Sequence, residues 1–251
     1  MTQGRGTTVP ATQFSSQLAP LQDQITQFWN WRSATQESGA LAIRSEEELQ
    51  IWVEVMRGLL PTAPADVVDL GTGQGFLALV CAALGHRVRG FDISDIQVAH
   101  AREFASQVSN APRFAVGDAN APDLPPASQD VVTNRNILWT LIDAPSAFRN
   151  WFTILRPGGR LLTFHGVSPD GESQETKDRR FSHYTDAVKD RLLPIHRIPT
   201  FEPVMPLVTT AGFVDVQIER FESIERFDRE FAKQDKIWQV LTAVRPARSG
   251  A

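Results

Sequence analysis

The sequence predicts an α/β protein built on a doubly wound, Rossmann-like, mostly parallel sheet. Three observations predict this class. Short apolar runs alternate with segments of helical spacing, a glycine-rich turn follows the first of these runs, and further glycines stand where helices should end. Apolar runs of this kind are typical of strands buried on both faces, and their alternation with helices favours parallel pairing.

The predicted elements follow in a regular order. A helix is expected from Ser45, because Ser45 and Glu48 have the spacing of a capping box and an apolar face follows them. Further helical patterns begin at Phe76, Asp95, Leu138 and Pro145. The predicted strands are the segments ADVVDL, HRVRGF, RFAVGD, DVVTN, GRLLTFH, GFVDVQIERF and KIWQVLTAV.

Length and composition favour one globular domain. The chain has 251 residues, of which 42% are hydrophobic, and this is enough for a single core. We expect one domain over residues 21–245, with disordered tails at residues 1–20 and 246–251, where small and polar residues dominate. The polar segment at about 167–203 is interpreted as a lid insertion, because simple connections usually have ~2–6 residues.

Charge and cysteine content exclude several classes of function. The chain has 25 basic and 29 acidic residues and no run of Lys or Arg, so no nucleic-acid partner is indicated. Cys81 is the only cysteine, which excludes an internal disulfide and a cysteine-based zinc site, and no metal is predicted. No segment approaches the ~18 apolar residues of a membrane span. We therefore expect a cytoplasmic protein without membrane contact, as a monomer or homodimer.

The segment VVDLGTGQGF, residues 67–76, carries the first functional signal. It joins the first strand to the helix behind it, where ligands of α/β sheets bind. Glycine lets the backbone turn sharply and lets a ligand approach it. A dinucleotide fingerprint would require glycine where Phe76 stands, and no lysine of a phosphate-binding loop follows. The motif therefore predicts a loop for another ligand, preceded by the acid Asp69.

Two further acids end the next two predicted strands. Asp92 closes the run RVRGFD and can accept hydrogen bonds from both hydroxyl groups of a ribose in the same crevice. Asp118 follows Gly117 at the end of the third strand, where it can meet the exocyclic amine of an adenine. A glycine loop, a ribose acid and an adenine acid in this chain order predict a nucleoside-containing ligand.

With these motifs the chain resembles the class I S-adenosylmethionine-dependent methyltransferases, in particular the small-molecule branch of the ubiquinone and menaquinone type. The resemblance covers about residues 45–245 through the segments VVDLGTGQGF, RVRGFDIS, VGDA, DVVTNRNILWTL, LRPGGRLL and AGFVDVQI. It implies a seven-stranded sheet with an antiparallel last strand and N-terminal helices. It also implies S-adenosyl-L-methionine as cofactor, with S-adenosyl-L-homocysteine as product. The implied cofactor-binding residues are Asp69, Gly71, Thr72, Gly73, Gly75, Asp92, Ile93, Gly117, Asp118, Ala119 and Asn134.

The resemblance implies methyl transfer to an O or N atom of a small molecule, such as a specialised metabolite. Three alternatives stay open: a C-methyltransferase of the quinone type, a protein that binds S-adenosylmethionine without catalysis, and a nicotinamide-dependent oxidoreductase, which Phe76 disfavours. The segment after the fourth strand lacks the amino-methyltransferase tetrad, which argues against methylation of DNA bases.

Candidate residues for the reaction are few. A general base is needed only if the acceptor loses a proton, and the candidates are His165, His183 and Tyr184. Tyr184 is also a candidate substrate-binding residue, together with Trp29, Trp31 and Trp139, because aromatic rings suit a planar acceptor and attract a sulfonium cation.

Overall fold

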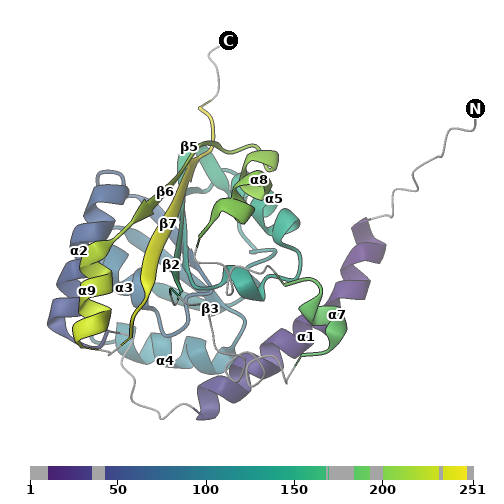
Figure 1. Ribbon diagram of the computed structural model, residues 1–251, viewed down its shortest axis with the longest axis horizontal. Helices are drawn as coiled ribbons and strands as arrows, with labels where there is room; N and C mark the ends of the chain where they lie inside the picture. Colours follow the sequence, from purple (N-terminus) through teal and green to yellow (C-terminus); the bar gives the residue numbers. More distant parts are fainter. Residues whose placement is uncertain are drawn as a thin grey trace, which may run out of the picture.

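The computed structural model describes residues 11–35, 43–167, 169, 184–192, 200–231 and 234–247. Its centre is one seven-stranded sheet with the order β3-β2-β1-β4-β5-β7-β6. Figure 1 shows α2, α3 and α9 on one side of this sheet and α5 and α8 on the other. The predicted doubly wound α/β class is therefore confirmed.

The strands lie where the apolar runs predicted them. Only β7 runs antiparallel to its neighbours β5 and β6, so the expected reversed last strand is confirmed as well. The strand bounds are β1 Asp66–Leu70, β2 Arg87–Asp92, β3 Arg113–Val116, β4 Gln129–Arg135, β5 Leu155–Val167, β6 Val214–Arg220 and β7 Ile237–Val244.

Most helices also begin where the sequence predicts. The helix expected at Leu138 is instead the single 3₁₀ turn η1. The helical bounds are α1 Ala11–Thr35, α2 Glu46–Leu59, α3 Phe76–Ala83, α4 Asp95–Ala105, η1 Leu138–Thr140, α5 Ala144–Ile154, α7 Asp186–Lys189, η3 Glu202–Val204, α8 Met205–Thr210 and α9 Glu222–Glu230. None of the described helices is long and apolar enough to cross a membrane.

Two expectations concern segments outside the sheet, one in the N-terminal part of the chain and one in its middle. Helix α1 begins at Ala11, inside the segment that we expected to be a disordered tail. Its Ala, Gln and Leu residues are good helix formers, and its second half packs on the domain, so composition alone was misleading. Most of the predicted lid lies outside the described residues, which include only 169, 184–192 and 200–203 of it.

The sheet is buried on both faces, as a parallel sheet requires. Neighbouring residues of β1 show this directly, because Val67 packs with α2 and α3 whereas Val68 packs with the cluster of α1 and α5. Leu161 and Leu162 of β5 divide between the same two clusters. The sheet is thereby held between two layers, and its strand ends are fixed relative to both.

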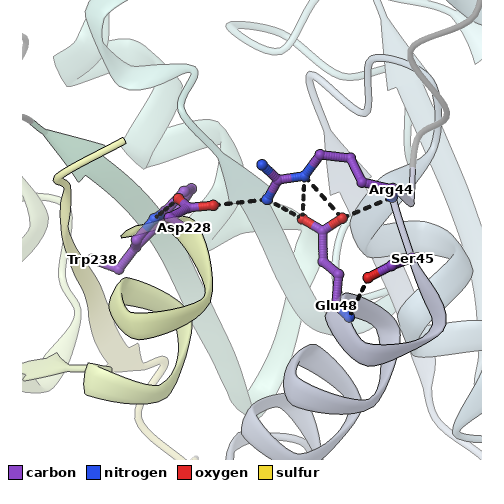
Figure 2. A network of polar contacts seen from close by, with 5 residues as sticks. All are labelled: Arg44, Ser45, Glu48, Asp228 and Trp238. Carbon is purple, nitrogen blue, oxygen red and sulfur yellow. Dashed lines mark hydrogen bonds and ion pairs between the residues drawn. The ribbon is translucent and has the colours of Figure 1, made fainter. Parts of the chain in front are cut away.

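A polar network fastens α2 to α9 and β7 (Figure 2). Ser45 caps α2 by accepting a hydrogen bond from the Glu48 amide, as predicted. The Arg44 guanidinium bridges two buried carboxylates, with Nη2 at 2.5 Å from Glu48 Oε1 and 2.7 Å from Asp228 Oδ1. Trp238 Nε1 donates to the other Asp228 oxygen at 2.7 Å. All four carboxylate oxygens of this network are therefore occupied.

The Trp52 side chain is the packing centre of this face. Its ring lies edge-on to Phe76, Phe164 and Trp238 at centroid distances of 5.2, 5.3 and 5.4 Å, and it is 1% exposed. Trp52→Ala should cost about 3–5 kcal/mol of unfolding free energy. In a domain of this size that lowers the melting temperature by roughly 6–20 °C.

Thermal unfolding followed by circular dichroism tests this expectation. Trp31→Ala is the matched control, because Trp31 is 47% exposed and should shift the midpoint much less. Equal losses in the two variants would contradict the assigned core.

Candidate active site

A cavity of about 320 Å³ opens at the carboxyl ends of β1, β2 and β4. Strand order reverses here, because β1 pairs with β2 on one side and with β4 on the other. The described lining residues come from α1, from the carboxyl ends of β1, β2 and β4, from the loops after β1 to β4, and from the first turns of α3 and α4. This is the place where doubly wound sheets bind ligands, and the volume is in the range of small-molecule sites.

The glycine loop forms one wall of the cavity. Gly71, Gly73 and Gly75 all have positive φ angles of 66°, 55° and 90°, which side chains rarely adopt. A Cβ atom on Gly71 would overlap Ile137, and one on Gly75 would lie 2.8 Å from the Phe114 ring. A Cβ atom on Gly73 would meet nothing within 4 Å. Gly71 and Gly73 line the cavity, whereas Gly75 serves packing.

Asp69 lies at the end of β1 and is 2% exposed. Its Oδ2 accepts a hydrogen bond from Thr72 Oγ1 at 2.7 Å. Burial raises the pKa of this carboxyl to about 7, against the opposing effects of the Thr72 hydrogen bond and the positive charge of Arg135. Asp69 and Thr72 both line the cavity.

Asp92 joins the end of β2 to the glycine loop. Its Oδ2 accepts from the Gly73 amide at 2.8 Å, and its Oδ1 accepts from the Ser94 amide at 2.9 Å. Burial raises the pKa of this carboxyl, and these amide hydrogen bonds oppose the rise. Ser94 in turn caps α4, as predicted, by accepting from the Gln97 amide. The Asp92 carboxylate and Ile93 line the cavity beside the loop.

Asp118 and Ala119 follow β3 and line the cavity farther along the sheet. Asp118 Oδ1 accepts from the Asn120 amide at 2.8 Å and from Gln22 Nε2 of α1 at 3.3 Å. Trp151 Nε1 of α5 donates to the Ala119 carbonyl at 2.7 Å, which fixes the loop from behind. Helix α1 thus closes this end of the cavity.

Aromatic side chains cluster around Trp29, in the part of the cavity lining that α1 supplies; we call this part the aromatic wall. Trp29 of α1 lines the cavity, and its ring lies 5.6 Å from that of Trp139 in η1. Behind it, the rings of Phe28 and the buried Tyr184 lie 5.0 Å apart. Trp31 lies 6.1 Å from Phe28 and points largely to solvent. Among the aromatic candidates, Trp29 alone is placed against the cavity by these contacts.

Several sequence-predicted residues lie elsewhere. Asn134 is fully buried and donates to Thr163 Oγ1 at 3.1 Å, between β4 and β5, and it does not line the cavity. Gly117 is also outside the lining, because it packs against Phe91. His165 is buried in β5, with its ring 6.1 Å from Phe201. His183 lies outside the described residues.

The structure also adds lining residues that the motif did not indicate. At the end of β4, the cavity is lined by Arg135, Asn136 and Ile137 rather than by Asn134. Successive side chains of a strand point to opposite faces, so a one-residue error at the strand end selects the wrong side. The other additions are Gln22, Ile25, Gln74, Phe76, Leu77, Gln97, Asn120, Thr140 and Leu141.

The cavity fits a nucleoside with a charged tail. Carboxylates from the ends of three neighbouring strands line it in the order expected for an amino group, a ribose and an adenine. Gly73 leaves open space where a side chain would intrude. The buried Gln97 Oε1, which also lines the cavity, has no hydrogen-bond partner among the described residues. Among the residues that the structure describes, no cluster of His, Cys, Asp or Glu could hold a metal ion.

We expect Asp92→Ala to lower the affinity for S-adenosylhomocysteine at least tenfold. Each hydrogen bond to a charged group contributes about 1.5–3 kcal/mol, and a loss of about 1.4 kcal/mol is a tenfold change. The substitution also frees the Gly73 amide. Calorimetric titration measures the change, with the exposed Asp95→Ala as control. Unchanged binding by Asp92→Ala would remove Asp92 from the site.

Gly73→Val should abolish binding of the same ligand. The branched side chain would enter the cavity from a backbone position with φ of 55°, which β-branched residues avoid. The matched control is Gly58→Val on the outer helix α2, where the added Cβ also meets nothing within 4 Å. Wild-type affinity in Gly73→Val would mean that the ligand lies elsewhere.

The raised pKa of Asp69 predicts a pH-dependent affinity. A ligand ammonium group beside Asp69 favours the ionised carboxylate, so binding below about pH 7 must release a proton. Affinity should fall as the pH drops from 7.5 to 5.5, by up to about tenfold per unit for one proton. The charges of Asp92 and Arg135 also influence the pKa of Asp69. The control is therefore Asp69→Asn, which lacks the titrating carboxyl group. The same pH profile in Asp69→Asn would contradict the assignment.

Comparisons with known proteins agree with the fold and the motif order. Residues 68–163, from β1 into β5, match the family model described as a methyltransferase domain. Phosphoethanolamine N-methyltransferase 1 of Arabidopsis thaliana is 28% identical over 186 residues, which are 67% of this chain and 36% of that protein. An S-adenosyl-L-methionine-dependent Diels-Alderase of Talaromyces variabilis is 27% identical over 180 residues, covering 69% and 59%. The chain spans about a third of the plant relative's length.

A solved structure extends the agreement to the whole fold. Phosphoethanolamine N-methyltransferase 2 of Haemonchus contortus, in complex with phosphomonomethylethanolamine and S-adenosylhomocysteine, superposes with a TM-score of 0.65 at 19% identity. The superposition covers 88% of this chain and 60% of that one. The family match includes the loops after β1 to β4 that line the cavity. The protein is a member of the class I S-adenosylmethionine-dependent methyltransferase family.

Proposed function

We propose that the protein transfers the methyl group of S-adenosylmethionine to an O or N atom of a small molecule. The observation that carries this proposal is one cavity with two unlike walls. Strand-end carboxylates and the glycine loop supply one part of the lining, and Trp29 of α1 supplies another. A cofactor held by the carboxylates and the glycine loop can therefore present its methyl group to an acceptor that contacts Trp29.

The residues of the first wall suit each part of the cofactor. Asp92 would hold the ribose, Asp118 and Ala119 the adenine, and the loop from Gly71 to Gly73 the amino-acid part. When bound, S-adenosylmethionine supplies a methyl group on a sulfonium, which is a good leaving group. The chain then has to place the acceptor atom about 3 Å from the methyl carbon, because orientation supplies much of the rate.

The second wall suits a small acceptor. Trp29 lines the cavity with Trp139 packed against it, and an aromatic, largely apolar lining is typical of small-molecule sites. An aromatic ring here also stabilises positive charge on the sulfonium or on an acceptor amine. Trp29 is the substrate-binding residue that these contacts favour.

No described lining residue is an obvious general base. The acids of the first wall are assigned to the cofactor, and the lining contains no His, Lys or Tyr among the described residues. His165 lies next to Gly166, whose amide donates to Asn136 Oδ1 at the cavity rim. His165 and Tyr184 therefore remain proposals for proton transfer, and a neutral amine acceptor would need neither group before attack.

The relatives suggest which acceptors to test first. Those named phosphoethanolamine N-methyltransferases support an amine nitrogen as the methylated atom. We therefore place phosphoethanolamine and its monomethyl form at the head of a panel that also contains phenols and quinols. The quinols test the C-methyltransferase alternative.

A second candidate is a cyclase that binds S-adenosylmethionine without transferring its methyl group. The relative named a Diels-Alderase favours it, because it matches 69% of this chain. The two candidates differ in one product. Methyl transfer releases one S-adenosylhomocysteine for each methylated acceptor, whereas cyclisation releases none.

The deciding experiment incubates the purified protein with S-adenosylmethionine carrying a labelled methyl group and the acceptor panel. We expect one acceptor to gain the label in proportion to S-adenosylhomocysteine release. Trp29→Ala should raise the acceptor KM with little change in cofactor affinity, whereas Trp31→Ala, on the same helix, should change neither. Tight cofactor binding with no labelled product from a broad panel would favour the second candidate.

A further inference from the structure

Arg135 is the basic exception in an otherwise acidic cavity. It ends β4, and among the described lining residues it is the basic one beside Asp69, Asp92 and Asp118. The acids match the amino, ribose and adenine groups of the cofactor. None of those groups is negatively charged, so the positive charge of Arg135 has to be matched by another, anionic group.

The surroundings of Arg135 hold its guanidinium in place without using its hydrogen-bond donors. The guanidinium carbon lies 4.0 Å from the ring centroid of Phe76 and 5.7 Å from that of Trp52. Such stacking orients the planar group and leaves its edge N–H groups available. Within the part of the chain that the structure describes, Arg135 makes no side-chain hydrogen bond or ion pair.

The nearby acids are hydrogen-bonded to other groups in this arrangement. Glu48 and Asp228 favour the charged form of Arg135 through space, but Arg44 and Trp238 already occupy their oxygens (Figure 2). Burial lowers the pKa of Arg135, so its charge carries a desolvation cost. A guanidinium with five donors and no acceptor in the described part of the chain is therefore available to bind an anion in the cavity.

The position of Arg135 identifies the part of the ligand. Asp69 and Arg135 interact electrostatically across the start of α3, and Phe76, which carries the guanidinium, is the first residue of that helix. The free amide groups at the N-terminus of α3 add positive potential here, and no acidic residue in the first turn of the helix offsets it. One acidic and one basic group at the same end of the cavity complement a zwitterion.

We propose that Arg135 binds the α-carboxylate of S-adenosylmethionine while Asp69 faces its ammonium group. The inference rests on the proposed function, because it takes this cofactor as the ligand. A guanidinium can bind a carboxylate through two parallel hydrogen bonds, which Gln cannot reproduce and Lys reproduces only as a point charge. Arg135 is thereby a cofactor-binding residue that fixes the amino-acid end and, through it, the direction of the methyl group.

The test compares two ligands that differ in one group. Calorimetry measures the affinities of S-adenosylmethionine and decarboxylated S-adenosylmethionine for wild type, Arg135→Gln and Arg135→Lys. Wild type should prefer the carboxylated ligand at least tenfold. Arg135→Gln should lose most of this preference, and Arg135→Lys should retain part of it. The exposed Arg113→Gln on β3 is the matched control and should keep the full preference.

Each alternative has its own outcome. Retention of the wild-type preference by a folded Arg135→Gln, as judged by thermal unfolding, overturns the inference. Unchanged cofactor affinity with a raised KM for anionic acceptors only would also overturn it, because Arg135 would then hold an anion of the acceptor. A wild-type protein that binds neither ligand would instead contradict the proposed function itself.

Discussion

The site depends on the Asp92 carboxylate, which ties the glycine loop to the end of the neighbouring strand. One oxygen accepts from the Gly73 amide and the other from the Ser94 amide, so a single side chain fixes the loop after β1 and the start of α4. A backbone bond from the Thr72 amide to the Phe91 carbonyl supports the same junction. These bonds hold the loop in the conformation with positive φ angles, and the cavity wall is thereby preformed.

Charge burial around this junction has a functional consequence. Asp69 and Asp92 are both raised in pKa by desolvation, which means that the protein holds acids where their charged forms are costly. A cationic ligand stabilises the charged carboxylates and so removes part of this cost. The cavity therefore binds positively charged groups in preference to neutral ones. The single Arg135 modifies this preference at one end, and the cavity thereby distinguishes a zwitterionic tail from a simple cation.

Local sequence signals predicted the sheet and the strand-end acids well. Ser45, Ser94 and the glycines act through neighbours within a few residues, and Asp92 stands at a strand end that the apolar run defines. The side of β4 that faces the cavity was not predictable, because Asn134, Arg135 and Asn136 are all polar and only tertiary packing decides which points inward. The contribution of α1 was hidden for a similar reason. Gln22 and Trp29 reach the cavity through the docking of a helix far from it in sequence, and no local pattern specifies that docking.

The central claim is that this cavity holds the cofactor with its sulfur directed toward the aromatic wall. A crystal structure of the complex with S-adenosylhomocysteine tests it most directly. The account predicts the ribose within hydrogen-bond distance of Asp92, the adenine beside Asp118 and Ala119, and the sulfur on the side of Trp29. Density for the ligand at any other place on the protein, or in this cavity with the adenine at the Trp29 end, would contradict the account.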